Sequence, residues 1–176
     1  MKVLKYLSCV SSIRGVANNM DISKHGSIIE PIIDLAMAQA TYDNVEEFIP
    51  EIRTGKVVKV YDGDTITIAS RLWIDGNETS KLYKFSVRLN GIDTPELKTK
   101  NPTEKSRALL ARDDLHDLIF GSIVTLSNTS YDKYGRILAD VFTAYGVNVS
   151  EWMVKKGHAV TYDGGKKIRP AEWTTD

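Results

Sequence analysis

The chain has 176 residues, 42% of them hydrophobic, which is enough to fill the core of one domain. Its formal net charge is zero, and its single cysteine, Cys9, excludes both an intrachain disulfide framework and a cysteine-based zinc cluster. No segment has the roughly 20 apolar residues that cross a membrane, and Lys5 and serines interrupt the start of the chain in a way that is unlike a secretion signal. We therefore expect a monomer of the cytoplasm or another intracellular compartment, without membrane attachment.

An N-terminal arm is expected over residues 1–50. Its first part is rich in Ser, Asn and Gly and has no hydrophobic period. Ser27 and Glu30 then have the spacing of a capping box, and apolar residues at helical spacing predict an amphipathic helix at residues 28–40, followed by a linker that reaches Pro50. We expect this helix to pack on the domain that follows; the alternative is an independent arm that binds a partner or anchors the protein.

Strand patterns begin in the second segment, residues 51–176. Strands are predicted at Val57–Val60 and at Thr65–Ile68, on either side of an Asp-Gly turn. A third strand is predicted at residues 83–90, where Tyr83 and three further apolar residues alternate with polar ones. The alternation places the apolar side chains, Tyr83 and Phe85 included, in the core and directs Arg88 to the opposite face.

Helices and strands alternate in the remainder of the chain. A helix is predicted from Pro102 to Phe120, strands at 122–128 and 137–143, and a second helix at Val147–Lys156, with a glycine after each helix. Three strands, a helix, two strands and a helix is the element order of an OB-fold. The prediction is therefore an α+β, mainly β fold: a five-stranded OB-fold barrel with two to three helices, plus the N-terminal arm.

Four short clusters carry side chains suited to phosphate chemistry. They are Asp62-Gly-Asp-Thr65, Arg88-Leu-Asn-Gly-Ile-Asp-Thr-Pro-Glu96, Asp132-Lys-Tyr-Gly-Arg136, and Val147-Asn148 with Gly157. In this order and spacing, over about residues 55–162, they resemble the staphylococcal nuclease (thermonuclease) family. The resemblance implies a calcium-dependent endonuclease, a phosphodiester hydrolase that acts on DNA, RNA or both. Residues 51–170 contain 19 basic and 15 acidic residues. This small excess of positive charge is compatible with nucleic-acid binding but does not by itself indicate it.

Three catalytic residues are implied by the resemblance. Arg88 and Arg136 match the two arginines that bind the phosphate in the family, and planar guanidinium groups suit the geometry of phosphate. Glu96 matches the glutamate usually assigned as the general base. The structural alternatives are surface salt bridges for the arginines and an exposed loop carboxylate for Glu96.

Ca²⁺ is the implied cofactor. Asp64 and Asp93 match the family's calcium ligands, with the backbone carbonyl of Thr94 as a further ligand, and hard oxygen donors favour such a cation. Asp62 resembles a supporting acidic residue near the ion. The alternative for Asp64 is a carboxylate that caps the turn.

Substrate contacts are implied for three more residues. Lys133 and Tyr134 match residues that contact the nucleotide phosphate, and Tyr162 lies near the position of a tyrosine that stacks on the base. The first hairpin is longer, and the loop after Glu96 shorter, than in the bacterial enzyme. The segment after Tyr162 leaves little room for the family's last helix.

Two other functions are compatible with the same fold. Nuclease-like domains of Tudor-type proteins have lost their catalytic residues and serve as noncatalytic binding modules, whereas this sequence retains the arginines, the acidic ligands and Glu96. A nonenzymatic OB-fold that binds single strands would need exposed aromatic residues on the barrel, and Tyr83 and Phe85 are assigned to the core. The nuclease is therefore the preferred interpretation.

Overall fold

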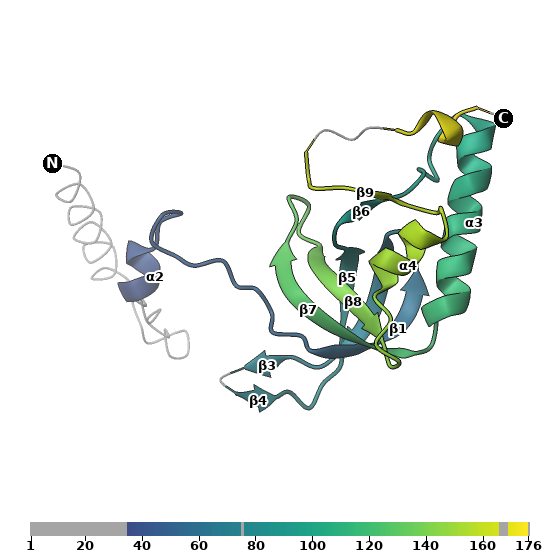
Figure 1. Cartoon of the computed structure of the whole chain (residues 1–176). Coiled ribbons are helices and arrows are strands. Elements are labelled where there is room, and N and C mark those ends of the chain that lie inside the picture. The colour runs from purple at the N-terminus through teal and green to yellow at the C-terminus, as the bar shows by residue number, and fades with distance from the viewer. Residues whose placement is uncertain (1–34, 75, 166–168, 176) are drawn as a thin grey trace, which may run out of the picture. The chain divides into compact units, whose positions relative to one another are not determined.

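The computed structural model describes residues 35–74, 76–165 and 169–175, and the contacts divide the chain into two units between Glu46 and Glu47. In the first unit, Leu35–Gln39 forms the short helix α2 (Figure 1). The remainder of the helix predicted at 28–40 lies outside the described residues. The packing expected for that helix therefore stays a prediction.

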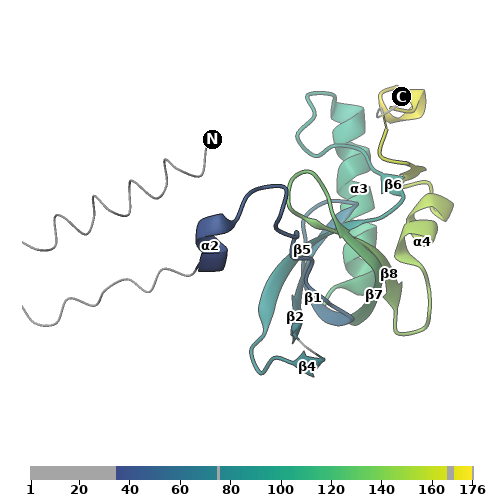
Figure 2. The same ribbon diagram turned by 90° about the vertical axis from the view of Figure 1, so that its left-hand side faces the viewer.

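Five strands of the second unit form a closed barrel in the order β1-β2-β5-β8-β7 (Figure 2). The strands are β1 (Thr54–Val60), β2 (Thr65–Ser70), β5 (Tyr83–Leu89), β7 (Ile123–Tyr131) and β8 (Ile137–Thr143). Neighbouring strands are antiparallel except β5 and β8, which run parallel where Val87 is opposite Ile137. The predicted five-stranded OB-fold barrel is confirmed.

Side chains that alternate along the strands fill the barrel. Val57, Ile66, Ile68, Val87 and Leu89 are fully buried in one core cluster. This matches the alternation predicted for β5 at its C-terminal end.

The start of β5 departs from that prediction. Tyr83 is 42% exposed and Phe85 is half-buried against the core, so the assignment of Tyr83 to the core is wrong. The reason is the register: β8 pairs with β5 only from Val87 onward, so the barrel wall is incomplete beside Tyr83.

Two helices complete the barrel domain. Helix α3 (Pro102–Ile119) begins at Asn101, whose side chain accepts a hydrogen bond from the backbone N–H of Glu104 at 2.9 Å, and it buries an apolar stripe against the core. Helix α4 (Val149–Lys155) is likewise capped by an asparagine. Over the described ranges, no helix has the length and apolar character needed to span a bilayer.

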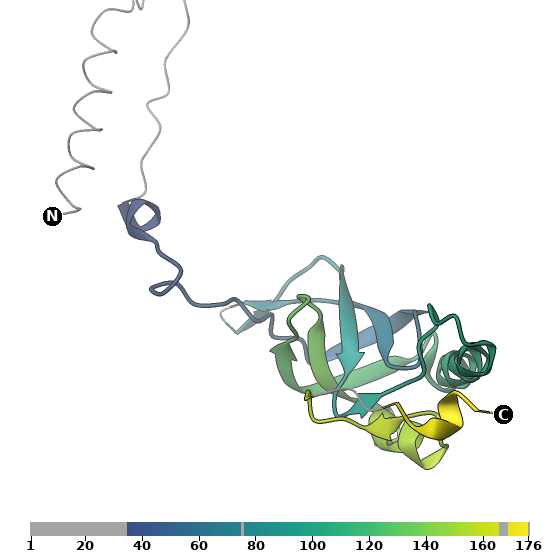
Figure 3. The ribbon, with the colours of Figure 1, turned by 90° about the horizontal axis from the view of Figure 1, so that it is seen from above.

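Five short elements lie outside the barrel, and the sequence did not indicate them. They are β3 (Trp73–Ile74) with β4 (Asn77–Glu78), β6 (Ile92–Asp93) with β9 (Val160–Thr161), and the 3₁₀ helix η2 (Ala171–Trp173). Figure 3 shows the C-terminal segment beside α3, where the carbonyl of Thr174 accepts a hydrogen bond from Asn101 Nδ2 at 3.1 Å. Trp173 in this segment is buried.

Candidate functional site

Three loops and the segment that follows β9 surround an open cleft of about 1150 Å³ at one end of the barrel. The loops are the β1–β2 turn, the loop that follows β5, and the β7–β8 turn. The structure brings together in this lining eight of the nine site residues expected from the sequence: Asp64, Arg88, Thr94, Glu96, Lys133, Tyr134, Arg136 and Tyr162. The ninth, Asp93, contacts Arg88 directly.

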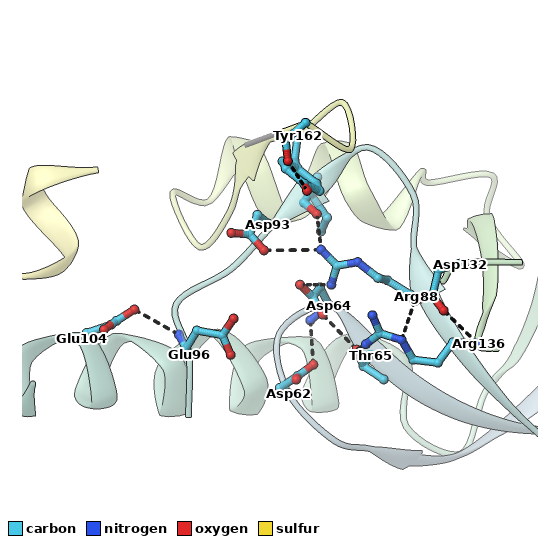
Figure 4. Close-up of polar contacts among 12 residues, drawn as sticks. Asp62, Asp64, Thr65, Arg88, Asp93, Glu96, Glu104, Asp132, Arg136 and Tyr162 are labelled. Carbon is cyan, nitrogen blue, oxygen red and sulfur yellow. Dashed lines mark hydrogen bonds and ion pairs between the residues drawn. The ribbon is translucent and has the colours of Figure 1, made fainter. Parts of the chain in front are cut away.

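Arg88 lies between two buried carboxylates (Figure 4). Its Nη1 forms an ion pair with Asp64, and its Nη2 lies 3.3 Å from Asp93 Oδ1 and donates to the carbonyl of Ile92 at 3.0 Å. Burial alone would lower the pKa of Arg88, but the negative charges of Asp64 and Asp93 raise it above its ordinary value. The guanidinium therefore stays charged although its side chain is only 10% exposed.

Arg136 is attached to the same cluster through Thr65. Its Nη1 donates to Thr65 Oγ1 at 3.1 Å, and that hydroxyl donates to Asp64 Oδ1 at 2.9 Å. On its other side, Arg136 Nε donates to Asp132 Oδ2 at 2.7 Å. The two arginines are therefore linked through Asp64 and Thr65, although Arg88 is on β5 and Arg136 is in the β7–β8 turn.

The β7–β8 turn is built to present Arg136. Asp132 Oδ1 accepts hydrogen bonds from the backbone N–H groups of Tyr134 and Arg136, both at 2.9 Å, and Gly135 supplies the positive φ of 77° that closes the turn. Burial alone would raise the pKa of Asp132, but the hydrogen bonds and charge of Arg136 hold it below its ordinary value. Asp132 thus fixes the backbone and the guanidinium of one arginine with a single carboxylate.

Glu96 is half-buried and lines the cleft after Pro95. In Figure 4 its side chain extends toward Asp64 and away from Glu104. Its backbone N–H donates to Glu104 Oε1 at 3.4 Å, and Glu104 is only 1% exposed. The loop of Glu96 is therefore attached to the first turn of α3.

The residues expected to hold a metal are oxygen donors that lie close together beside Arg88. Asp64 and Asp93 are 5% and 3% exposed, both have an oxygen directed at the same guanidinium, and their two negative charges exceed the single positive charge of Arg88. Thr94 is also buried and follows in the same loop. Hard oxygen donors beside excess negative charge fit a cation such as Ca²⁺.

The protein groups alone do not make a complete coordination shell. Within the described part of the chain, no three His, Cys, Asp or Glu side chains gather into a group that could hold a metal ion. Asp62 is close to Asp64, and burial together with the charge of Asp64 raises the pKa of Asp62 to about 6. Oxygens from water or substrate would have to complete the shell around a bound cation.

The residues expected to contact substrate differ in how far their side chains are exposed or bonded to neighbouring residues. Lys133 Nζ and Arg136 Cζ lie 5.2 Å and 5.6 Å from the centre of the Tyr134 ring, which is 73% exposed. The hydroxyl of Tyr162 donates to the carbonyl of Gly165 at 2.8 Å, and its backbone N–H donates to Gly91. Tyr162 lines the cleft, but its hydroxyl is bonded within its own loop.

Three supporting residues were not singled out from the sequence. Thr65 bridges the arginines, Asp132 orients Arg136, and Glu104 contacts the Glu96 loop. Thr65 and Asp132 are end residues of clusters in which other residues had a predicted role, so their position in a motif could have indicated them. Glu104 had a signal of its own, because Asn101-Pro-Thr-Glu104 is a helix-capping pattern.

Residues 86–172 match the profile of the family described as staphylococcal nuclease homologue. An uncharacterized endonuclease of Escherichia coli is 34% identical over 62% of this chain and 61% of its own length. Endonuclease Htp3 of Saprolegnia parasitica is 32% identical over 68% of this chain and 62% of its own. Staphylococcal-like nuclease CAN1 of Arabidopsis thaliana is 36% identical over 57% of this chain and 29% of its own, so the chain spans less than two thirds of each relative.

Proposed function

Because the chain contains a staphylococcal nuclease-like domain, we propose that the protein is an endonuclease that hydrolyses phosphodiester bonds in DNA, RNA or both. The single observation that carries the proposal is the linkage of Arg88 to Arg136 through Asp64 and Thr65 in one cleft that Glu96 also lines. Phosphodiester hydrolysis needs this combination, since negative charge grows on the phosphate oxygens as water attacks.

The arginines bind and stabilise the reacting phosphate. Arg136 donates hydrogen bonds from Nε to Asp132 and from Nη1 to Thr65. These two bonds fix the plane of its guanidinium at the edge of the cleft. Arg88 is held in place by Asp64 and Asp93. Guanidinium groups that are already oriented need no rearrangement when the oxyanion develops, and this lowers the barrier.

Glu96 acts as the general base. It takes a proton from the attacking water, so that the developing hydroxide reaches phosphorus from the side opposite the leaving oxygen. The contact between its backbone and Glu104 holds the loop against α3 while the carboxylate projects into the cleft. Lys133 and Tyr134 contact the phosphate next to the cleaved bond, and Tyr162 borders the space for the base.

Calcium is the cofactor of this proposal. Asp64, Asp93 and the carbonyl of Thr94 would hold it, and the cation, when bound, would supply further positive charge to the phosphate. The alternative, a noncatalytic nuclease-like module that only binds nucleic acid or protein, needs neither Glu96 nor a pair of oriented arginines. Their presence together in the cleft supports the enzyme.

The test is digestion of circular single-stranded DNA, duplex DNA and RNA, each with calcium, magnesium or a chelator. Circular DNA has no ends, so its cleavage demonstrates an endonuclease. The Glu96→Gln protein, purified in the same way, controls for contaminating nucleases. Failure of the wild-type protein to cut any substrate in calcium would leave the binding module as the function.

A further inference from the structure

Charged side chains are distributed unevenly over the barrel. The five barrel strands, all of them within the described residues, contain five charged residues: Lys56, Lys59, Lys84, Arg88 and Asp140. The four cations are on β1 and β5, whereas the acid is on β8, where it accepts hydrogen bonds from two asparagine amides. A chain of zero net charge thus carries only cations on the first three strands of its barrel.

The register of β1, β2 and β5 brings these cations onto one face. Residues paired across antiparallel strands share a face, and the pairs form three rows. The rows are Lys56–Ala69–Lys84, Lys59–Thr67–Ser86 and Thr65–Arg88. Ile66, Ile68 and Val87, which alternate with residues of these rows, are fully buried, so the side chains of the three rows point away from the core of the barrel.

The lysines of the first two rows are open to solvent, whereas Thr65 and Arg88 in the third row are buried. Lys56, Lys59 and Lys84 are exposed, and among the described residues none of the three forms an ion pair with a carboxylate. The β2 side chains between them are small, Thr67 and Ala69. No large side chain of β2 therefore interrupts a path across the three strands.

An aromatic ring connects the lysines to the candidate active site. Tyr61 follows β1 directly, is 46% exposed, and its backbone N–H donates to the carbonyl of Thr65 at 2.9 Å. Lys59 Nζ lies 5.5 Å from the centre of its ring. Thr65 in turn contacts both Asp64 and Arg136, so Tyr61 contacts Lys59 through its ring and, through its backbone, the residue that bridges the arginines.

We propose that Lys56, Lys59, Tyr61 and Lys84 form a lysine face that binds a single-stranded segment of nucleic acid leading to the phosphate site. The lysines contact backbone phosphates, and Tyr61 stacks on an unpaired base. Lys84 and Arg88 are four residues apart on one strand, about 13 Å at 3.3 Å per residue. A short run of successive phosphates in one strand covers this distance.

A single strand is preferred over a duplex because of Tyr61. Stacking on an aromatic side chain requires a base that is free of its neighbours, whereas the lysines alone would attract either form. The contacts carry no sequence information, since they involve phosphates and the face of a base. This proposal rests on the proposed nuclease function for cleavage, but binding to the face can be measured without cleavage.

The first experiment removes the three charges in Lys56→Gln/Lys59→Gln/Lys84→Gln. Its matched control is Lys105→Gln/Lys155→Gln/Lys156→Gln, which removes three exposed lysines from α3 and α4. Affinity for a fluorescent single-stranded 25-nucleotide DNA is measured by anisotropy in chelator at several salt concentrations. The face variant should bind about tenfold more weakly or worse, and its salt slope should fall by about 2, at 0.7 per phosphate contact.

The second experiment separates stacking from charge with Tyr61→Ala. Tyr145 is 95% exposed after β8, and Tyr145→Ala is the control. Tyr61→Ala should weaken single-strand binding about fivefold or more while duplex affinity stays the same. An equal loss for the duplex would overturn the assignment of Tyr61 to an unpaired base.

Cleavage supplies an independent readout. In the face variant, the ratio of kcat/KM for the 25-nucleotide substrate to that for a trinucleotide should fall about tenfold, because only the longer strand reaches the lysines. The control triple variant should keep the wild-type ratio. Binding equal to that of the control variant, or absence of binding by the wild-type protein, overturns the lysine face; binding without cleavage overturns the nuclease function alone.

Discussion

Replacement of Arg88 by lysine tests the catalytic proposal because it keeps the charge and changes the geometry. The guanidinium uses one nitrogen for Asp64 and the other for Asp93 and the carbonyl of Ile92. Lysine has a single terminal nitrogen, so it cannot face both carboxylates and a phosphate oxygen together. The developing oxyanion therefore loses a donor.

The magnitude follows from that lost donor. Removal of one oriented donor to an oxyanion lowers turnover by about 10²- to 10³-fold, or about 2.7–4 kcal/mol in the activation barrier. We expect kcat of Arg88→Lys to fall by about 10² or more, with a smaller change in KM. Because the Arg88 side chain is only 10% exposed, the variant should also lose about 1–3 kcal/mol of stability.

The assay measures kcat and KM on a single-stranded oligonucleotide in calcium, with urea unfolding of the same preparations. Arg53→Lys is the control, because Arg53 also pairs with a carboxylate, that of Glu51 at 2.6 Å, but its side chain is 58% exposed and does not line the cleft. The control should match the wild type in both measurements. Turnover of folded Arg88→Lys within about threefold of the wild type would refute the role of Arg88.

Four further predictions concern the metal, the base, the β7–β8 turn and the N-terminal arm. Asp64→Asn should abolish cleavage and calcium-dependent stabilisation in thermal melts; full activity in chelator would contradict the calcium proposal. Arg136→Lys and Glu96→Gln should each lower kcat by about 10²-fold, and wild-type rates in both would mean that the site lies elsewhere. Asp132 has a lowered pKa in the folded state, so its stabilisation is present above its ordinary pKa of 3.8 and is lost as pH falls through the folded value. Asp132→Asn should therefore lower the free energy of unfolding by about 1–3 kcal/mol at pH 7 and by less near pH 3, and urea melts showing a constant deficit would contradict this. A chain of residues 41–176 should melt below the full chain if the arm helix packs on the barrel, and equal melting temperatures would favour an independent arm.

The regular elements could be predicted because their patterns are long. Val87 and Leu89 alternate with polar residues over most of β5, and Asn101 with Pro102 marks the start of α3 within one residue. The β6–β9 ladder could not be predicted. It has two residues on each side, too few to show a period, and it pairs segments far apart in sequence.

The sequence could predict which residues line the site but not the hydrogen bonds that join them. Motif resemblance indicated Asp64, Arg88 and Arg136, but not that Thr65 would bridge them, since a threonine after an aspartate is common in any strand. The exposure of Tyr83 was missed for a different reason. Alternation assigns a residue to a face, whereas the extent of the neighbouring strand decides whether that face is covered there.

The β6–β9 pair also determines when the site can form during synthesis. Asp93 is held opposite Val160, and Tyr162, two residues after Val160, donates its backbone N–H to the carbonyl of Gly91 in the loop that carries Asp93. A ribosome makes the chain from its N-terminus, so the loop that carries Asp93 is complete long before Val160 has left the exit tunnel. Until then the loop that carries Asp93 lacks its strand partner. The lining of the cleft, which includes Tyr162, is therefore completed only after β9 has been synthesised.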